Sequence, residues 1–140
     1  MAPTVQSALE QRLEFALAAA KAAGAITLRY FQDSSLRVDT KIDRSVVTEA
    51  DRSAERQLRN AIAQDFPDDA IVGEEFGERG GSSGWTWYLD PIDGTQAFVR
   101  GVPLFGTLIG VEYRGVSKIG VIFLPALGEM VYAGSGLGCY

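Results

Sequence analysis

The hydrophobic periodicity of this chain changes near Pro67, and that change limits the folds that it can adopt. Over about residues 6–31, apolar side chains recur every three or four positions, which predicts an amphipathic helix. A second helix is predicted over residues 48–66, and Pro67 ends it. Beyond it the pattern predicts strands at residues 70–73, 85–89, 104–112, 116–123 and 129–133. This order indicates an α+β fold, with two N-terminal helices packed on a mostly antiparallel sheet.

The composition and charge disfavour several classes of protein. With 46% hydrophobic residues, the 140-residue chain is typical of one soluble globular domain. Its net charge of −5 disfavours nucleic-acid binding. The longest apolar run, residues 104–111, is too short to span a bilayer, and charged residues interrupt residues 1–31, so we expect no signal peptide. The single cysteine, Cys139, excludes an internal disulfide and favours a reducing compartment, so we expect a cytoplasmic protein.

The chain contains no histidine, and this absence restricts the chemistry open to it. A Ser-His-Asp triad, a Cys-His pair and a histidine-bound zinc site cannot be built from this sequence. Any catalysis must use carboxylates, hydroxyl groups, lysine, arginine or backbone amides.

Three segments carry acidic residues where the chain enters or leaves a predicted element: residues 47–51, 73–75 and 90–95. Each has a purely structural interpretation as well. Thr48 and Asp51 have the spacing of a helix capping box, the glutamates after residue 73 suit a solvated loop, and residues 90–95 suit an Asp-Gly turn. The turn is the weakest of these interpretations, because the aromatic residues just before it favour burial.

Taken together, the three acidic segments favour a metal site. Like charges about 4 Å apart repel by roughly 4 kcal/mol at an effective dielectric of about 20, and divalent cations would turn this repulsion into attraction. Oxygen ligands suit a hard cation, above all Mg²⁺. If a helix begins after Asp93, backbone N–H groups of the Asp-Gly-Thr segment can hold a phosphate. A metal, a phosphate site and a hydroxyl predict hydrolysis of a phosphoryl group.

The spacing of the acids excludes three other motifs. Haloacid-dehalogenase-type phosphatases have one residue between the aspartates of D-x-D-G-T, whereas two residues separate Asp90 from Asp93. An EF-hand loop beginning at Asp90 would need a glutamate at its twelfth position, which is Gly101. The phosphate-binding sequence G-x-x-x-x-G-K-[ST] is absent.

The motifs VVTEAD (46–51), VGEE (72–75) and WYLDPIDGTQAF (87–98) resemble, in the same order, those of the inositol monophosphatase family of magnesium-dependent phosphatases. The resemblance covers nearly the whole chain but only the N-terminal half of the family's usual length. It implies that residues 1–140 are an N-terminal α+β metal-binding half and that the C-terminal half is absent. That half would supply a further metal-binding aspartate and most of the substrate contacts.

The resemblance also implies a set of metal ligands. It assigns this role to the side chains of Glu74, Asp90 and Asp93 and to the backbone carbonyl of Ile92. The alternation of side chains along a strand allows only one of Glu74 and Glu75 to face the metal, and the family pattern selects Glu74.

For the reaction, the resemblance assigns Asp51 and Thr95 to hold and activate the attacking water, without a covalent phosphoenzyme. The amides of Gly94 and Thr95 would bind the phosphate. Ala97 stands where inositol phosphatases usually have the asparagine of D-G-T-x-N-F, and together with residues 101–109 and 124–127 this resembles the histidinol-phosphatase branch. The expected reaction is the Mg²⁺-dependent hydrolysis of histidinol phosphate in histidine biosynthesis.

Two other functions remain open from the sequence. One is an inositol-1-monophosphatase or a related nucleotide or sugar phosphatase. The other belongs to a different class, a non-catalytic fragment that keeps a metal site without turnover. The expected partner is a small phosphorylated metabolite rather than nucleic acid or a membrane, and a homodimer is one open oligomeric state.

Overall fold

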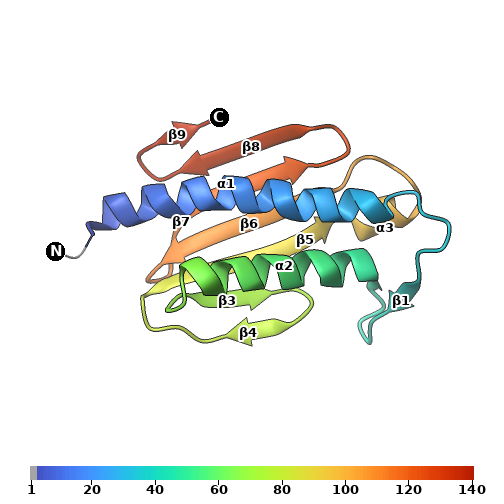
Figure 1. The fold of residues 1–140 in the computed structure, drawn as a ribbon, viewed down its shortest axis with the longest axis horizontal. Coiled ribbons are helices and arrows are strands. Elements are labelled where there is room, and N and C mark those ends of the chain that lie inside the picture. The colour runs from blue at the N-terminus through green and yellow to red at the C-terminus, as the bar shows by residue number, and fades with distance from the viewer. Residues whose placement is uncertain (1–2) are drawn as a thin grey trace.

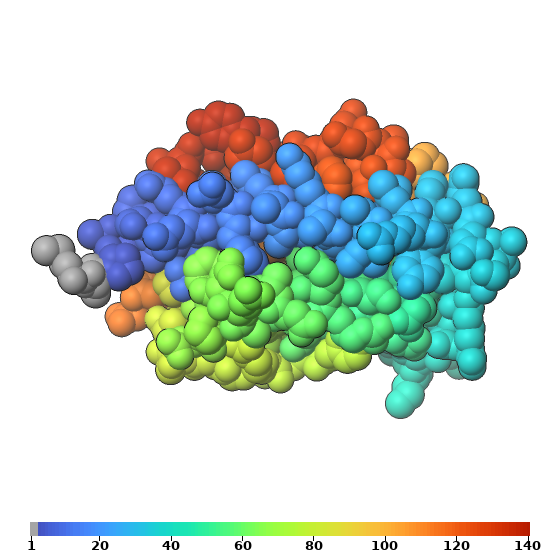
Figure 2. All heavy atoms as spheres, viewed as in Figure 1, coloured from blue at the N-terminus to red at the C-terminus, as the bar shows by residue number. Residues whose placement is uncertain are grey.

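Two long helices lie side by side on one face of a seven-stranded sheet in the computed structural model of this chain, which describes residues 3–140 (Figure 1). Helix α1 spans Val5–Tyr30 and α2 spans Glu49–Asp65, and each has a threonine as its N-cap. Figure 2 shows the two helices covering much of this face of the molecule. The predicted α+β architecture is confirmed. None of the helices within the described residues is long and apolar enough to cross a bilayer.

Within residues 3–140, the sheet is antiparallel except where β3 pairs with β5. Its strand order is β4-β3-β5-β6-β7-β8-β9, and β3 and β5 run parallel. The strands span Ala70–Gly73 (β3), Gly77–Arg79 (β4), Trp85–Asp93 (β5), Gly106–Tyr113 (β6), Val116–Leu124 (β7), Glu129–Gly134 (β8) and Gly138–Cys139 (β9). A separate two-stranded sheet pairs β1 (Val38–Thr40) with β2 (Val46–Thr48), directly before α2.

Three local features differ from the prediction. Residues 77–79 form β4, paired with β3, in a stretch where no strand was predicted. Strand β5 continues to Asp93, beyond the predicted end at residue 89. Helix α3, Thr95–Val99, has only five residues and was expected only as a condition for phosphate binding. Segments of three to five residues are too short to show a clear hydrophobic period, so their structure depends on the neighbours that they pack against.

The main hydrophobic core fills the space between the helices and the sheet. Trp87 of β5 is completely buried, and its ring centroid lies 5.4 Å from that of Phe15 on α1 and 5.6 Å from that of Phe66, the C-cap of α2. Full burial of a large apolar side chain stabilises a fold by roughly 1.5–3 kcal/mol. These contacts therefore fix the central strand against both helices.

A buried ion pair joins α1 to the residue that precedes β3. Arg12 donates two hydrogen bonds of 2.8 Å to the carboxylate of Asp69, and its guanidinium lies 4.5 Å from the ring centroids of Phe66 and Trp85. The ring N–H of Trp87 donates a further hydrogen bond to Asp69. Because several donors surround this carboxylate, its charge is compensated in the interior.

The face of the sheet opposite the helices carries exposed apolar side chains. Tyr88, Ile122 and Val131, on β5, β7 and β8, are 41%, 47% and 53% exposed. Ile122 and Val131 are register partners. Tyr88 and Ile122 alternate along their strands with core residues such as Trp87 and Val121, so they point away from α1 and α2.

We expect the isolated chain to self-associate through this face, because an extended apolar surface favours association. Replacing Ile122 with lysine should shift the chain toward monomer and leave its helix content unchanged. Val5→Lys, at a similarly exposed position on α1, is the matched control and should not alter the association. Sedimentation velocity over a range of concentrations measures the effect. A wild-type chain that stays monomeric throughout would contradict the prediction.

Candidate active site

The parallel pairing of β3 with β5 brings two acidic residues to the same edge of the sheet. Gly73, the last residue of β3, is the register partner of Leu89, and the N–H of Glu74 donates a 3.2 Å hydrogen bond to the Leu89 carbonyl. The residues that follow Gly73 and Leu89 are Glu74 and Asp90. Because parallel strands run in the same direction, both carboxylates emerge at this edge.

An irregularity in β5 adds a third acid. The register between β5 and β6 shifts between Asp90 and Asp93. In the interrupted stretch, the Thr107 hydroxyl donates a 3.0 Å hydrogen bond to the Pro91 carbonyl, and Ile92 is buried in a second, smaller core. Such an irregularity redirects the side chains of the strand. Here it leaves Asp93 exposed at the same end of β5 as Asp90.

Six of the seven predicted site residues line one cleft of about 230 Å³. The cleft is lined by Ser45, Val46, Glu74, Asp90, Ile92, Asp93, Gly94, Thr95 and Gln96. The seventh predicted residue, Asp51, is buried and lies in contact with Thr95. The structure thus brings Glu74, which follows β3, and the acids of β5 together with the start of α3.

The carboxyl group of Asp90 is strongly perturbed by its surroundings. Burial, the charge and hydrogen bond of Glu74, and the charges of Asp93 and Asp51 together raise the pKa of Asp90 from 3.8 to about 8. Without a counter-charge, this carboxyl group therefore retains a proton near neutral pH. A cation among these acids would favour its ionised form.

The donor set fits a hard divalent cation in its chemistry. Three carboxylates and the Ile92 carbonyl offer only oxygen, and their mutual repulsion is of the kind that a cation relieves. Within residues 3–140, however, no group of three or more acidic, cysteine or histidine side chains is already arranged to hold a metal ion. Binding would therefore require the carboxylates of the cleft to rearrange around the ion.

Asp51 has two sets of partners at the start of α2. One carboxylate oxygen accepts hydrogen bonds of 2.7 Å from both the N–H and the hydroxyl of Thr48, which completes a capping box. The other oxygen lies 3.2 Å from the Thr95 hydroxyl. Burial raises the pKa of Asp51, although the hydrogen bonds from Thr48 and Thr95 oppose the shift. The structural interpretation of Asp51 as a cap is thus compatible with a functional one.

The Thr95 hydroxyl lies between two acceptors, 3.2 Å from Asp51 and 3.1 Å from the Ile92 carbonyl. It has one proton, so it can donate to only one of them at a time. Gly94, the N-cap of α3, has a left-handed conformation with φ of 84°, which favours glycine. The first N–H groups of a helix lack partners within the helix, so those of α3 are available to a ligand.

Three charged residues near the cleft were not among the predicted site residues. The side chain of Glu75 is almost fully buried and forms a 2.8 Å ion pair with Lys41, from the β1–β2 connection, whereas Glu74 lines the cleft. Glu55 of α2 accepts hydrogen bonds from the backbone just after Glu74. Nothing in the sequence around Lys41 indicates that it lies near the site. Glu55 lies one helical turn after Asp51, but this spacing alone does not distinguish it from a glutamate that faces water.

The raised pKa of Asp90 predicts how pH affects stability in the absence of metal. The unfolded chain ionises Asp90 near 3.8, whereas the folded chain keeps it protonated up to about 8. Between these pH values the unfolded state binds fewer protons than the folded state. The stability that protonated Asp90 contributes is therefore fully present below pH 3.8 and is lost as the pH rises to about 8. Asp90→Asn should remove it. Thermal denaturation in EDTA across this range measures the difference, and identical pH profiles for both chains would contradict the prediction.

Comparison with known proteins supports the resemblance drawn from the motifs. A sequence profile of the inositol monophosphatase family matches residues 8–140. The histidinol-phosphatase of Chlorobaculum parvum is 48% identical over 128 residues, which cover 91% of this chain and 49% of that protein. The histidinol-phosphatase of Mycobacterium tuberculosis is 43% identical over the same shares. The chain thus spans about half the length of these curated relatives.

A solved structure has the same fold. The crystal structure of the extragenic suppressor protein suhB from Bartonella henselae superposes with a TM-score of 0.88 at 31% identity, over 93% of this chain and 51% of that one. The helices packed on a mostly antiparallel sheet are therefore shared with a known protein. From the profile match and these relatives, we conclude that the chain belongs to the inositol monophosphatase family.

Proposed function

We propose that this chain is the metal-binding half of a phosphatase that uses Mg²⁺ to hydrolyse a small phosphate monoester. The observation that carries the proposal is the single cleft in which Glu74, just after β3, and the acids of β5 meet the start of α3, with the Asp51–Thr95 pair beside it. Membership of the inositol monophosphatase family supports phosphate-ester hydrolysis as the class of reaction.

In this proposal Glu74, Asp90 and Asp93, together with the Ile92 carbonyl, hold the cation. When bound, Mg²⁺ supplies positive charge that activates water and stabilises the developing charge of the phosphoryl group. The all-oxygen donor set and the chain's lack of histidine support a hard cation over zinc. Burial and the neighbouring acids raise the pKa of Asp90, and a positive charge at this position would offset both effects.

Asp51 and Thr95 would orient and deprotonate the attacking water. The Thr95 hydroxyl can donate its hydrogen bond to Asp51, which leaves an oxygen lone pair of Thr95 free to accept a hydrogen bond from water in the cleft. Because burial raises the pKa of Asp51, a proton passed from the water through Thr95 would be held more firmly there than on an ordinary aspartate. Thr48 occupies the second oxygen of Asp51 and so fixes which oxygen faces Thr95.

The phosphate would be held at the start of α3. The N–H groups of Gly94 and Thr95 begin this helix on the wall of the cleft, where the acids and the Thr95 hydroxyl also lie. Backbone N–H groups at a helix start attract anions. Water would then attack phosphorus directly, and the ester oxygen would leave without a covalent phosphoenzyme.

We propose histidinol phosphate as the substrate, with histidinol and phosphate as the products. Both curated relatives reported above are histidinol-phosphatases. Ala97, which stands where inositol phosphatases usually have asparagine, supports the same branch. With this substrate, the enzyme would act in the cytoplasm, in histidine biosynthesis. Its partner would be a small phosphorylated metabolite, and the oligomeric state to test is a homodimer.

Two observations bear on the alternative functions. The family description names inositol monophosphatase, which favours an inositol-1-phosphatase, or a related nucleotide or sugar phosphatase, as the second candidate. The chain spans about half the length of its curated relatives, so residues 1–140 on their own are also tested as a non-catalytic unit that retains the metal site.

We expect the isolated chain to release little or no phosphate, because the ligands and substrate contacts of a second half would be missing. A chimera in which these residues replace the matching half of the Chlorobaculum parvum histidinol-phosphatase should be active. Phosphate release with Mg²⁺, measured on histidinol phosphate and on inositol-1-phosphate, tests both chains. Preference of the chimera for inositol-1-phosphate would favour the second candidate. An isolated chain with ordinary enzyme turnover, about 1–10³ s⁻¹, would contradict the expectation.

In the same chimera, Thr95→Ala should lower kcat by on the order of 10²-fold or more, because a water-orienting hydroxyl is lost. KM should change little, since the hydroxyl acts mainly in the transition state. Thr95→Ser keeps the hydroxyl and is the control that should retain most of the activity. Steady-state kinetics separates the two parameters, and a change in KM alone would point to a structural turn.

A further inference from the structure

Glu55 is a buried acid that the proposed reaction does not use. Its side chain is 0% exposed, although it lies on α2, an amphipathic helix at the surface of the molecule. One carboxylate oxygen accepts a 2.8 Å hydrogen bond from Arg59 and a 3.1 Å hydrogen bond from the N–H of Phe76. The other accepts a 2.6 Å hydrogen bond from the N–H of Glu75. Two of its partners are therefore backbone groups of the β3–β4 turn.

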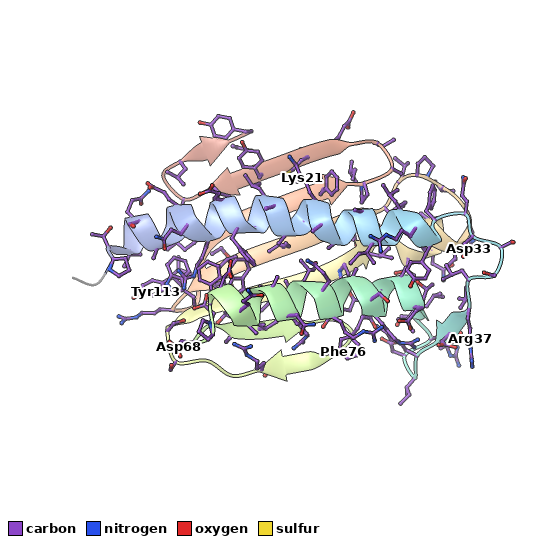
Figure 3. The ribbon with its side chains drawn as sticks, in the orientation of Figure 1. Lys21, Asp33, Arg37, Asp68, Phe76 and Tyr113 are labelled. Atoms are coloured by element: carbon purple, nitrogen blue, oxygen red, sulfur yellow. The ribbon has the colours of Figure 1, made fainter. Side chains whose placement is uncertain are left out.

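The β3–β4 turn, residues 74–76, is the segment that carries Glu74. Glu55 caps two of its three N–H groups, and Arg59 also donates to the carbonyl of Gly77, where β4 begins. In Figure 3, Phe76 lies at the turn beside α2, whereas Asp68 lies near the opposite end of β3. The first turns of α2 thus hold the backbone on which Glu74 is mounted.

The close contact between α2 and β3 explains the glycine at position 73. A Cβ atom at Gly73 would lie 1.9 Å from a carboxylate oxygen of Glu55 and 2.7 Å from Arg59. Any larger residue would push the Glu55 carboxylate out of its place. The chain therefore combines a glycine, a buried acid and its arginine at one contact.

Stability alone is a weak reason for such a contact. Buried ion pairs are often no more stabilising than well-packed apolar residues, because both charges lose their hydration. An apolar residue at position 55 would leave the N–H groups of Glu75 and Phe76 without this acceptor and the turn without its anchor. The carboxylate is thus suited to fixing the turn.

We propose that Glu55 is a positioning residue for the cation site: it fixes the β3–β4 turn so that Glu74 is presented to the cleft. This inference rests on the proposed function, because it assumes that Glu74 binds the cation. Groups that orient metal ligands typically contribute 10–100-fold to metal affinity when they are not ligands themselves. Asp51 and Glu55, one helical turn apart, would then support the two sides of the cleft, Asp51 through Thr95 and Glu55 through the turn.

The test compares Glu55→Gln with Asp69→Asn in this chain. Glutamine keeps the shape of Glu55 but lacks the charge and presents an NH₂ group toward one of the two backbone donors. Asp69 is the matched control, because it is equally buried and paired with an arginine but precedes the other end of β3. Amide hydrogen exchange of residues 73–79 in metal-free protein and Mg²⁺ affinity by calorimetry are the two measurements.

For Glu55→Gln we expect faster exchange of the turn amides and an affinity for Mg²⁺ lower by on the order of 10–100-fold. Asp69→Asn should lower the midpoint of thermal denaturation but leave both measurements unchanged. If Glu55→Gln does not fold, Glu55→Asp keeps the charge, withdraws the carboxylate from the turn and should act in the same direction.

The outcomes separate this inference from the proposed function. A wild-type chain whose cleft residues show no protection by Mg²⁺ in hydrogen exchange would contradict the proposed cation site itself. A wild-type chain that binds Mg²⁺, with Glu55 variants of equal affinity and equal exchange at the turn, would contradict only the positioning role. Equal losses in the Glu55 and Asp69 variants would assign the effect to general destabilisation and also overturn it.

Discussion

Like-charge repulsion at one edge of the sheet is the constraint on which the site depends. Parallel pairing of β3 with β5 sets Glu74 beside Asp90, and the irregular end of β5 adds Asp93. In the absence of metal, the fold accommodates these acids by leaving Asp90 protonated near neutral pH and by exposing the other two. An arrangement that costs stability in the empty state is typical of a binding site, because a ligand of opposite charge recovers the loss.

Helix α2 connects the parts of this site that come from distant segments of the chain. Its first turn contains Asp51, which is bonded to the cap residue Thr48 and to Thr95 beyond β5. Its second turn contains Glu55, which binds the turn after β3. The core beneath it, centred on Trp87, holds α2 against the same strands. Packing of an ordinary amphipathic helix thus also sets the positions of the groups around the cleft.

Local patterns in the sequence predicted the long helices and strands and singled out the acids that line the cleft. They did not predict the strand pairing and the buried contacts that position these acids. The two helices and the strands from β5 to β8 follow from apolar spacing over eight or more residues or from turn residues on both sides. The parallel pairing of β3 could not be predicted, because four residues with an apolar run do not specify their partner. Glu55 was missed for a related reason. A glutamate on a helix usually faces water, and its burial here depends on the turn that packs against it.

The account depends on the acids of β3 and β5 converging on one cation, and anomalous scattering from crystals grown with Mn²⁺, a substitute for Mg²⁺, tests this most directly. We predict a peak in the cleft within about 2.0–2.6 Å of carboxylate oxygens from Glu74, Asp90 and Asp93, with the Ile92 carbonyl as a further ligand. Such a structure would also show these three carboxylates rearranged around the ion. Crystals in which the cleft contains no anomalous peak, with the three carboxylates directed apart, would contradict the account.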